Sequence, residues 1–450
     1  MKQFNKLLLT SFFLIPFQLF ADDLKKDVLS MRERANVRNA ILKDRFESVL
    51  PNIMRRNNID MWLIIAREYN EDPVIRTMLP ATWLNARRRT VLVVFDPGNN
   101  KPLETYAVAR YAVGEVFKKA WDPEVQPDQY KALAEIIKQK NPKKIGINKS
   151  EFFAQADGLS STEYDLLNKA LPRKYQKRIV SATNIAVGWL ETRSAKEMEI
   201  YPEICRIAHD IIKEGFSSNV ITPGVTTTDD IVWWYRERIR ELNFVTWFHP
   251  SVSIQRGDKQ NFDFLESFSN AKPESTVLPG DLLHVDFGIT YLSLNTDTQQ
   301  HSYVLMPGEN TVPNELTKAL AIGNRLQDIL TNQFKTGRTG NEMLLSALEQ
   351  AKSEGINPQI YTHPIGYYGH GSGPTIGMWD KQEGVPVNGD YPLYPNTAYS
   401  IELNAKVFIK SWGKEVAIQL EEDAFFDGET CEYIDPRQTE MIIIDWETDK

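Results

Sequence analysis

An aspartate inside an apolar strand is the feature that most constrains how this chain can fold. Strand alternation over Leu282–Phe287 places His284 and Asp286 on one face. The opposite, apolar face consists of Leu283, Val285 and Phe287. An ionised carboxylate in such a strand is destabilising unless a partner compensates its charge. The fold must therefore bring a compensating group to Asp286.

A second carboxylate, Asp297, follows eleven residues later. If residues 282–290 and 295–305 form an antiparallel hairpin, Asp286 and Asp297 approach each other across it. Two adjacent carboxylates raise each other's pKa unless a proton or a cation lies between them. Metal ions are the usual compensation, so the hairpin predicts a metal site.

Further donors follow towards the C-terminus. His363 and His370 lie in a glycine-rich segment, and Glu402 and Glu421 each lie in a strand-like run. One histidine with four carboxylates is a hard, oxygen-rich donor set that suits two divalent ions such as manganese, cobalt or zinc. Two such ions can polarise a carbonyl group and activate a water molecule.

The order of these donors resembles that of the pita-bread metallopeptidases, which include methionine aminopeptidase, aminopeptidase P, prolidase and the metal-free relative creatinase. The similarity covers roughly residues 190–445. The segments that carry it are Pro279-Gly280-Asp281, Val285-Asp286-Phe287-Gly288, Gly369-His370-Gly371-Ser372-Gly373, Ile401-Glu402 and Gln419-Leu420-Glu421. The resemblance implies two divalent ions held by Asp286, Asp297, His370, Glu402 and Glu421. It also gives Glu402 a second role, as proton relay to the leaving nitrogen.

Two histidines compete for the single histidine position. His370 has the local pattern of the family, a ligand flanked by glycines with Gly373 three residues after it. The family also places a substrate-contacting histidine seven residues after the ligand, and His370 lies seven residues after His363. We assign His370 as the ligand, because the glycines shape the backbone around the metal. His363 is then a catalytic candidate in the pocket, with a purely structural role as the alternative.

The sequence departs from the family pattern at several positions. With His370 as ligand, Gly377 replaces the expected second histidine. Leu403-Asn404 follows Glu402 where Pro-Gly is common, and Gln419 stands where aminopeptidase P-like enzymes carry arginine. A further family histidine has its nearest counterpart in His249. These differences leave the predicted metal site intact and bear on the choice of substrate.

Two folded units are predicted after an export signal. Lys2, Lys6 and the apolar stretch before Ala21 resemble a signal peptide over residues 1–21. Residues 22–188 alternate strand and helix patterns, which predicts an α/β unit similar to the creatinase-type N-terminal domain. Residues 189–450 then form the α+β pita-bread catalytic domain. One long helix is expected over residues 31–56, and capping boxes are expected at Ser160–Glu163 and Ser194–Glu197.

Export predicts a periplasmic or secreted protein with no stable membrane anchor after signal cleavage. The formal charge of -8 argues against nucleic acid as a partner. The resemblance implies a homo-oligomer, either a dimer or a tetramer. Cys205 and Cys431 are either bridged or two separate buried side chains.

The sequence therefore predicts an exported dinuclear metallopeptidase that hydrolyses the N-terminal bond of a peptide, most plausibly before proline. One alternative is a creatinase-type amidinohydrolase acting on a small guanidino compound. The other is a non-catalytic binding protein that kept the fold. The complete ligand set disfavours both.

Overall fold

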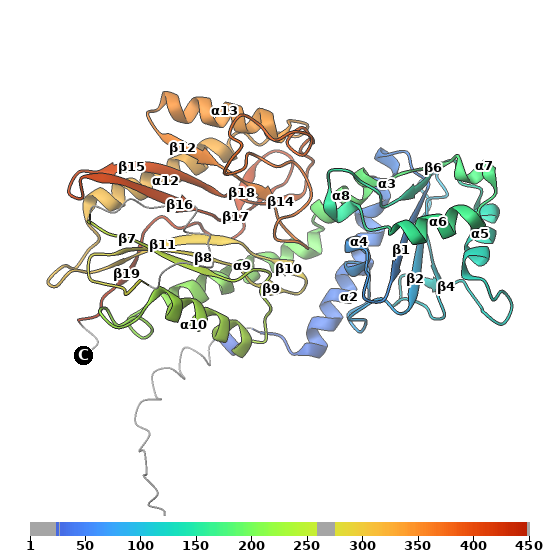
Figure 1. Cartoon of the computed structure of the whole chain (residues 1–450), viewed down its shortest axis with the longest axis horizontal. Coiled ribbons are helices and arrows are strands. Elements are labelled where there is room, and N and C mark those ends of the chain that lie inside the picture. Colours follow the sequence, from blue (N-terminus) through green and yellow to red (C-terminus); the bar gives the residue numbers. More distant parts are fainter. Residues whose placement is uncertain (1–23, 27, 259–274, 448–450) are drawn as a thin grey trace, which may run out of the picture.

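The computed structural model describes residues 24–26, 28–258 and 275–447, which form two units with helix α2 (Met31–Ser48) along their junction (Figure 1). The predicted signal segment, residues 1–21, lies outside the described residues. No helix in the described part of the chain combines the length and the apolar character needed to cross a bilayer.

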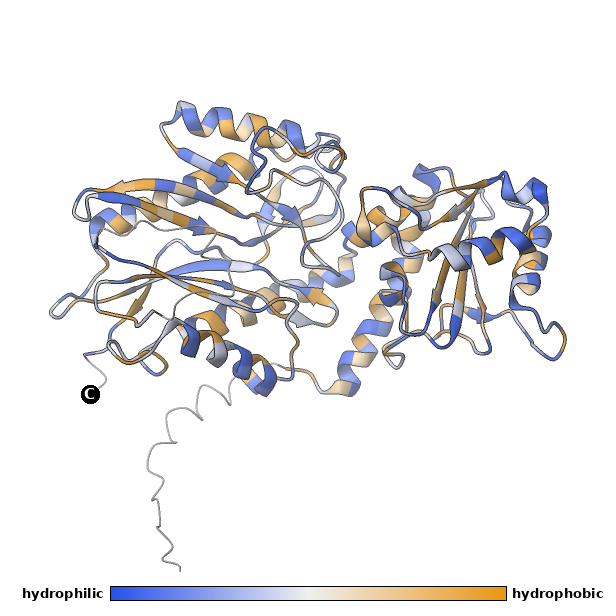
Figure 2. Cartoon of the chain, viewed as in Figure 1, coloured by the Kyte–Doolittle hydropathy of each residue, from blue (hydrophilic) through white to orange (hydrophobic). Residues whose placement is uncertain are grey.

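The N-terminal unit is built on a mixed sheet with the strand order β4-β3-β2-β1-β5-β6. These strands are β1 (Met61–Arg67), β2 (Arg89–Phe95), β3 (Glu104–Val108), β4 (Lys118–Lys119), β5 (Ile145–Ile147) and β6 (Ile179–Ser181). β1 pairs antiparallel with β2 and parallel with β5. The central strands are largely hydrophobic (Figure 2), because helices cover both faces of the sheet.

Alternate residues of β1 enter two separate cores. Trp62 and Ile64 pack towards α2, α3 (Leu50–Arg56) and α8 (Thr183–Glu191). Leu63 and Ile65 pack towards α5 (Gln129–Lys140) and α6 (Ser161–Ala170). The α/β character predicted for this part of the chain is confirmed.

Two local predictions for this unit are wrong. The expected single helix over residues 31–56 is divided at Val49 into α2 and α3, with Pro51 in the first turn of α3. Proline lacks an N–H group and its ring clashes with the preceding turn. The box at Ser160 does not form: Ser160 makes no side-chain capping bond, and the buried carboxylate of Glu163 accepts hydrogen bonds from Arg89 and Tyr130 instead of from the helix end. The second capping box, at Ser194 on α9, forms as predicted.

The C-terminal unit has two main sheets, each covered by a pair of helices (Figure 1). Helices α9 (Ala195–Gly215) and α10 (Thr228–Glu241) cover β19 (Ile442–Ile444), β11 (Thr298–Val304), β8 (Leu282–Phe287) and β7 (Ser251–Gln255). Helices α12 (Asn314–Thr331) and α13 (Gly340–Ser353) cover β12 (Asn357–Ile360), β15 (Leu403–Ile409) and β16 (Lys414–Leu420). A smaller sheet contains β13 (His363–Pro364), β14 (Thr397–Ser400), β17 (Asp423–Phe426) and β18 (Cys431–Tyr433).

The predicted hairpin forms between β8 and β11, which run antiparallel with Asp286 opposite Gln299. The apolar face predicted for β8 is also confirmed. Leu283, Val285 and Phe287 pack in the core beneath α9 and α10, whereas Leu282 enters the core beneath α12. The alternation of side chains along β8 therefore correctly placed Asp286 on the face of the sheet that is turned away from α9 and α10.

Buried charges join the two units. The guanidinium of Arg45, on α2, is fully buried and donates hydrogen bonds to Glu197 and to the carbonyl oxygens of Thr192 and Trp189. Arg193 also pairs with Glu197, at 3.0 Å. Because Glu197 lies in the first turn of α9, this network fixes α2 to the start of the C-terminal unit.

We expect Arg45→Met to lower the free energy of unfolding by about 3–5 kcal/mol, the usual effect of removing one member of a buried ion pair. The loss should fall near the lower limit, because Arg193 still pairs with Glu197. Urea unfolding followed by circular dichroism measures the change. Arg325→Met is the control, because the Arg325–Glu354 pair is on the surface and its loss should matter little. Equal destabilisation by the two variants would contradict this account.

Candidate metal centre

The four predicted carboxylates lie where strands end or change sheets. Asp286 is near the end of β8, and Asp297 immediately precedes β11. Glu402 lies between β14 and β15, and Glu421 lies between β16 and β17. At both glutamates the chain passes from one sheet to another. Their side chains therefore converge on the edge shared by these sheets.

All six site residues predicted from the sequence are brought together. Three overlapping groups have one possible ligand atom per residue, all within 4.8 Å of one another. The groups are Asp286 with Asp297 and Glu421, His363 with Glu402 and Glu421, and Asp297 with His363 and His370. Asp297 and Glu421 each belong to two groups, so the cluster is continuous.

The cluster concentrates negative charge in a buried place. Burial raises the pKa of Asp297 well above its usual value, and the charges of Glu421 and Asp286 raise it further. Burial and the charge of Glu421 likewise raise the pKa of Glu402. Within the described residues, no lysine or arginine pairs with Asp297, Glu402 or Glu421. This arrangement favours the binding of cations.

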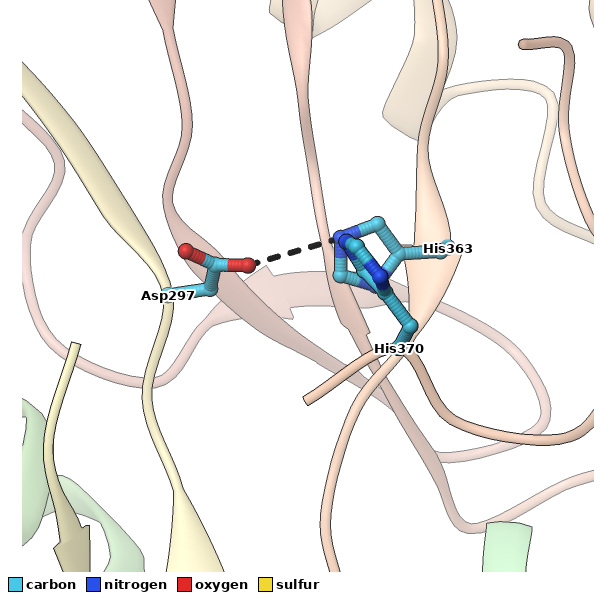
Figure 3. A group of neighbouring side chains, drawn as sticks. All are labelled: Asp297, His363 and His370. Carbon is cyan, nitrogen blue, oxygen red and sulfur yellow. Dashed lines mark ion pairs between the residues drawn. The ribbon is translucent and has the colours of Figure 1, made fainter. Parts of the chain in front are cut away.

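His363 directs its Nε2 atom at the carboxylate of Asp297 (Figure 3). That atom lies 3.4 Å from Glu421, 3.5 Å from Asp297 and 3.9 Å from Glu402, measured to the nearest carboxylate oxygen. Nε2 is buried and makes no hydrogen bond within the described structure. The other ring nitrogen, Nδ1, lies 3.1 Å from the carbonyl oxygen of Pro364.

This geometry is what a metal-ligating histidine requires. A hydrogen bond from Nδ1 to a carbonyl oxygen fixes the tautomer and leaves Nε2 available as a ligand. Burial lowers the pKa of His363, but the carboxylates of Glu421 and Glu402 outweigh burial and raise it to about 9. A proton on His363 thus partly compensates the carboxylates, and a bound cation would do so more fully.

His370 lies beside His363 but reaches fewer carboxylates. Its ring is exposed and stands almost perpendicular to the ring of His363, with 4.7 Å between the centroids. Trp247 contacts it from another side, with 5.1 Å between the centroids. The geometry therefore favours His363 as the ligand and His370 as its neighbour, the reverse of the sequence assignment.

The glycines around His370 have a packing role that explains this difference. A Cβ atom at Gly369 would lie 2.2 Å from the Trp247 ring, so the loop can approach that ring only with glycine here. Gly377 has a φ of +75°, and a Cβ atom there would lie 2.2 Å from the carbonyl oxygen of Ile360. With His363 as the ligand, His370 occupies the position seven residues later, and Gly377 is then no departure from the family pattern.

The N-terminal unit holds the loop that carries His370. Gln155 donates a hydrogen bond from Nε2 to the carbonyl oxygen of His370, at 2.9 Å. The hydroxyl of Ser372 donates to Oε1 of the same glutamine, at 3.0 Å. The hydroxyl of Tyr368 also donates to the carbonyl oxygen of Pro73, at 2.7 Å. Residues from both units thus define this side of the site.

Sequence reasoning missed Gln299 and Ser400, which both contact the glutamates. Gln299 donates to Glu402 and Glu421, and Ser400 donates to Glu421 at 2.7 Å. The signal for Gln299 was a run of polar residues within a strand predicted to pair with β8. His249, the nearest counterpart of a further family histidine, is exposed, packs on Trp233 and belongs to none of the three groups.

The residue next to Glu421 has different partners. Glu422 contacts His209 and Gln300 and belongs to none of the three groups. Cys205 and Cys431 are both free thiols, and Cys205 donates a weak hydrogen bond to Asp423. The two thiols therefore do not form the bridge that the sequence left open.

Comparisons with known proteins agree with this fold. The crystal structure of an X-Pro aminopeptidase from Thermotoga maritima superposes with a TM-score of 0.61 and 17% identity, covering 87% of this chain and 100% of that chain. An Xaa-Pro dipeptidase from Bacillus anthracis gives a TM-score of 0.57 and 17% identity, covering 92% and 100%. A prolidase from Pyrococcus horikoshii gives a TM-score of 0.53 and 16% identity, covering 89% of this chain and 99% of that chain. A search of curated proteins gave no match.

The family assignment comes from the sequence match. The model of metallopeptidase family M24 matches residues 199–426, slightly more than half of the 450 residues. These residues contain every member of the cluster, from Asp286 to Glu421. With the two-unit fold and the carboxylate-rich centre, this match shows that the chain belongs to metallopeptidase family M24 and is a metallopeptidase with the pita-bread fold.

Proposed function

We propose that this metallopeptidase removes the N-terminal residue from peptides in which proline is the second residue. The observation that carries the metal centre is the buried Nε2 atom of His363, which faces three carboxylates. Preference for Xaa-Pro bonds is supported by the names of structurally similar proteins, which act on X-Pro or Xaa-Pro substrates.

We further propose that two divalent ions, of manganese, cobalt or zinc, bind between Asp286, Asp297, His363, Glu402 and Glu421. The donors present fit such ions, because carboxylate oxygens and one imidazole nitrogen form a hard ligand set. When bound, the ions would supply Lewis-acid polarisation of the scissile carbonyl and activation of water.

The chain itself would move the proton and orient the peptide. Glu402 has a pKa raised by burial and by Glu421, so it can accept a proton and pass it to the leaving nitrogen. His370 is exposed between His363 and Trp247, where its ring can donate a hydrogen bond to the substrate. Gln155 would hold His370 in place from the N-terminal unit. We also propose that the protein is exported, because residues 1–21 resemble a signal peptide, and that it forms a dimer or tetramer, as the family resemblance implies.

The two histidines should fail differently. His363→Ala should lower both metal content and activity, because an open ligand position weakens at least one ion. His370→Ala should retain the metal and slow turnover by roughly 10²–10³-fold, the usual effect of losing one hydrogen-bond donor to the reacting group. Metal analysis after dialysis and steady-state kinetics on the same samples measure both effects.

The control for these variants is His249→Ala, because His249 is exposed outside the cluster and its loss should change neither quantity. If His370→Ala sheds metal and His363→Ala retains it, the assignment made from the glycine pattern is correct and the geometric one is wrong.

Activity should depend on metal and on proline. We expect the chelated protein to be inactive and to regain activity with manganese, cobalt or zinc. In matched peptide pairs that differ only at the second residue, the proline member should be hydrolysed faster. Release of the first amino acid, measured by chromatography, gives the rates. Comparing dipeptides with tripeptides separates a prolidase from an aminopeptidase.

Two outcomes of the same assay would contradict the proposal. Hydrolysis of creatine by the chelated protein would indicate a creatinase-type enzyme. Full metal content without hydrolysis of any peptide in the panel would indicate a binding protein that kept the fold.

A further inference from the structure

Strand β11 (Thr298–Val304) is unusual because it is polar and yet buried along its whole length. Figure 2 shows it in hydrophilic colours inside the C-terminal unit. Buried polar side chains are informative, because each must find hydrogen-bond partners to offset its desolvation. Among the residues of this strand, Gln299 has its partners within the metal centre itself.

Gln299 lies between two segments that carry carboxylates of the cluster, strand β8 and the connection between β16 and β17. On one side, its partner on β8 is Asp286. On the other side, its backbone exchanges two hydrogen bonds with that of Glu421, at 2.9 and 3.3 Å. The side chain is fully buried. Its Nε2 donates to Oε1 of Glu402 at 2.5 Å and to Oε2 of Glu421 at 2.6 Å. One amide group therefore joins two proposed ligands.

The chemistry of the partners fixes the direction of these hydrogen bonds. Ionised carboxylates only accept, so the NH₂ end of the amide must face Glu402 and Glu421. The amide oxygen then faces His284, whose Nε2 lies 2.9 Å away and must donate. The other ring nitrogen of His284 lies 3.4 Å from the hydroxyl of Ser253. Ser253 and His284 thus keep the amide of Gln299 in one orientation.

The amide uses the oxygens that do not face His363. Nε2 of His363 lies nearest to Oε2 of Glu402 and Oε1 of Glu421. Gln299 binds the other oxygen of each carboxylate. Ser400 also donates to Oε1 of Glu421 and so limits rotation of that carboxylate further. Each glutamate is therefore held with one oxygen turned towards His363.

We propose that Gln299 is a positioning residue that sets the orientation of Glu402 and Glu421 for metal binding. Its two amide hydrogens fix one oxygen of each glutamate, so that the second oxygen of each faces the ion proposed beside His363. This inference rests on the proposed metal centre and extends it to a residue with no ligand atom of its own. Hydrogen-bonding partners of metal ligands usually contribute about 10- to 100-fold to metal affinity.

The test compares Gln299→Met with Gln300→Met. Methionine has a similar length to glutamine but cannot donate a hydrogen bond. Gln300 is the neighbouring residue of the same strand, is also buried, and donates to Glu422 outside the cluster, at 3.0 Å. Gln299→Asn is a second variant, because it keeps a buried amide but is one methylene too short to reach both glutamates.

Cobalt(II) serves as the probe, because its visible absorption reports ligand geometry and its titration gives affinity without any substrate. Gln299→Met and Gln299→Asn should bind cobalt about 10- to 100-fold more weakly than the parent, with altered visible bands. Gln300→Met should retain the parent's affinity and spectrum. Circular dichroism confirms that each variant is folded, and Gln299→Asn decides the question if Gln299→Met does not fold.

Unchanged or tighter cobalt binding by the folded Gln299 variants would overturn this role while leaving the metal centre intact. An equal loss in Gln300→Met would overturn it as well, because the effect would then follow from any buried amide of β11. A parent protein that binds no cobalt would overturn both the metal centre and the role of Gln299.

Discussion

The mutual repulsion of buried carboxylates is the constraint on which this structure depends. Asp297, Glu402 and Glu421 are held where sheets meet, and no lysine or arginine among the described residues pairs with them. Such a cluster is stable only if other groups compensate it. His363 does so in part by retaining a proton, and amide and hydroxyl donors add to this. Divalent ions are the compensation that the donor set fits best.

The two aspartates, Asp286 and Asp297, could be predicted from sequence because their signal is local, whereas Glu402 and Glu421 were assigned through the family resemblance. An acid within an apolar strand, with a second acid eleven residues later, needs only period-two alternation to be interpreted. The histidine could not be assigned in the same way. The glycines near His370 are equally expected beside a metal and beneath a packed ring, and only the position of Trp247 distinguishes the two. Because this backbone pattern has two physical causes, it does not by itself distinguish the two histidines, and both lie in the cluster.

Tertiary contacts also explain what local rules missed in the N-terminal unit. Ser160 and Glu163 have the spacing of a capping box, but the side chain of Glu163 is buried and pairs with Arg89 instead of the helix end. Gln155 has no sequence signal at all, because its role depends on two distant segments lying side by side. Its hydrogen bond to the backbone of His370 makes the N-terminal unit part of the site. Residues of both units therefore define the side of the site on which His370 lies.

The adjacent glutamates Glu421 and Glu422 lie between β16 and β17 and have different hydrogen-bond partners. Pleating turns them to opposite sides, where Gln299 and Gln300 of β11 meet them in turn. Burial lowers the pKa of His209, but the carboxylates of Glu422 and Asp435 outweigh burial and raise it to about 10. His209 is thus a cation at neutral pH and pairs with both Glu422 and Asp435. Glu422 therefore has a cationic partner within the protein, whereas Glu421 pairs with no lysine or arginine among the described residues and faces the proposed metal centre.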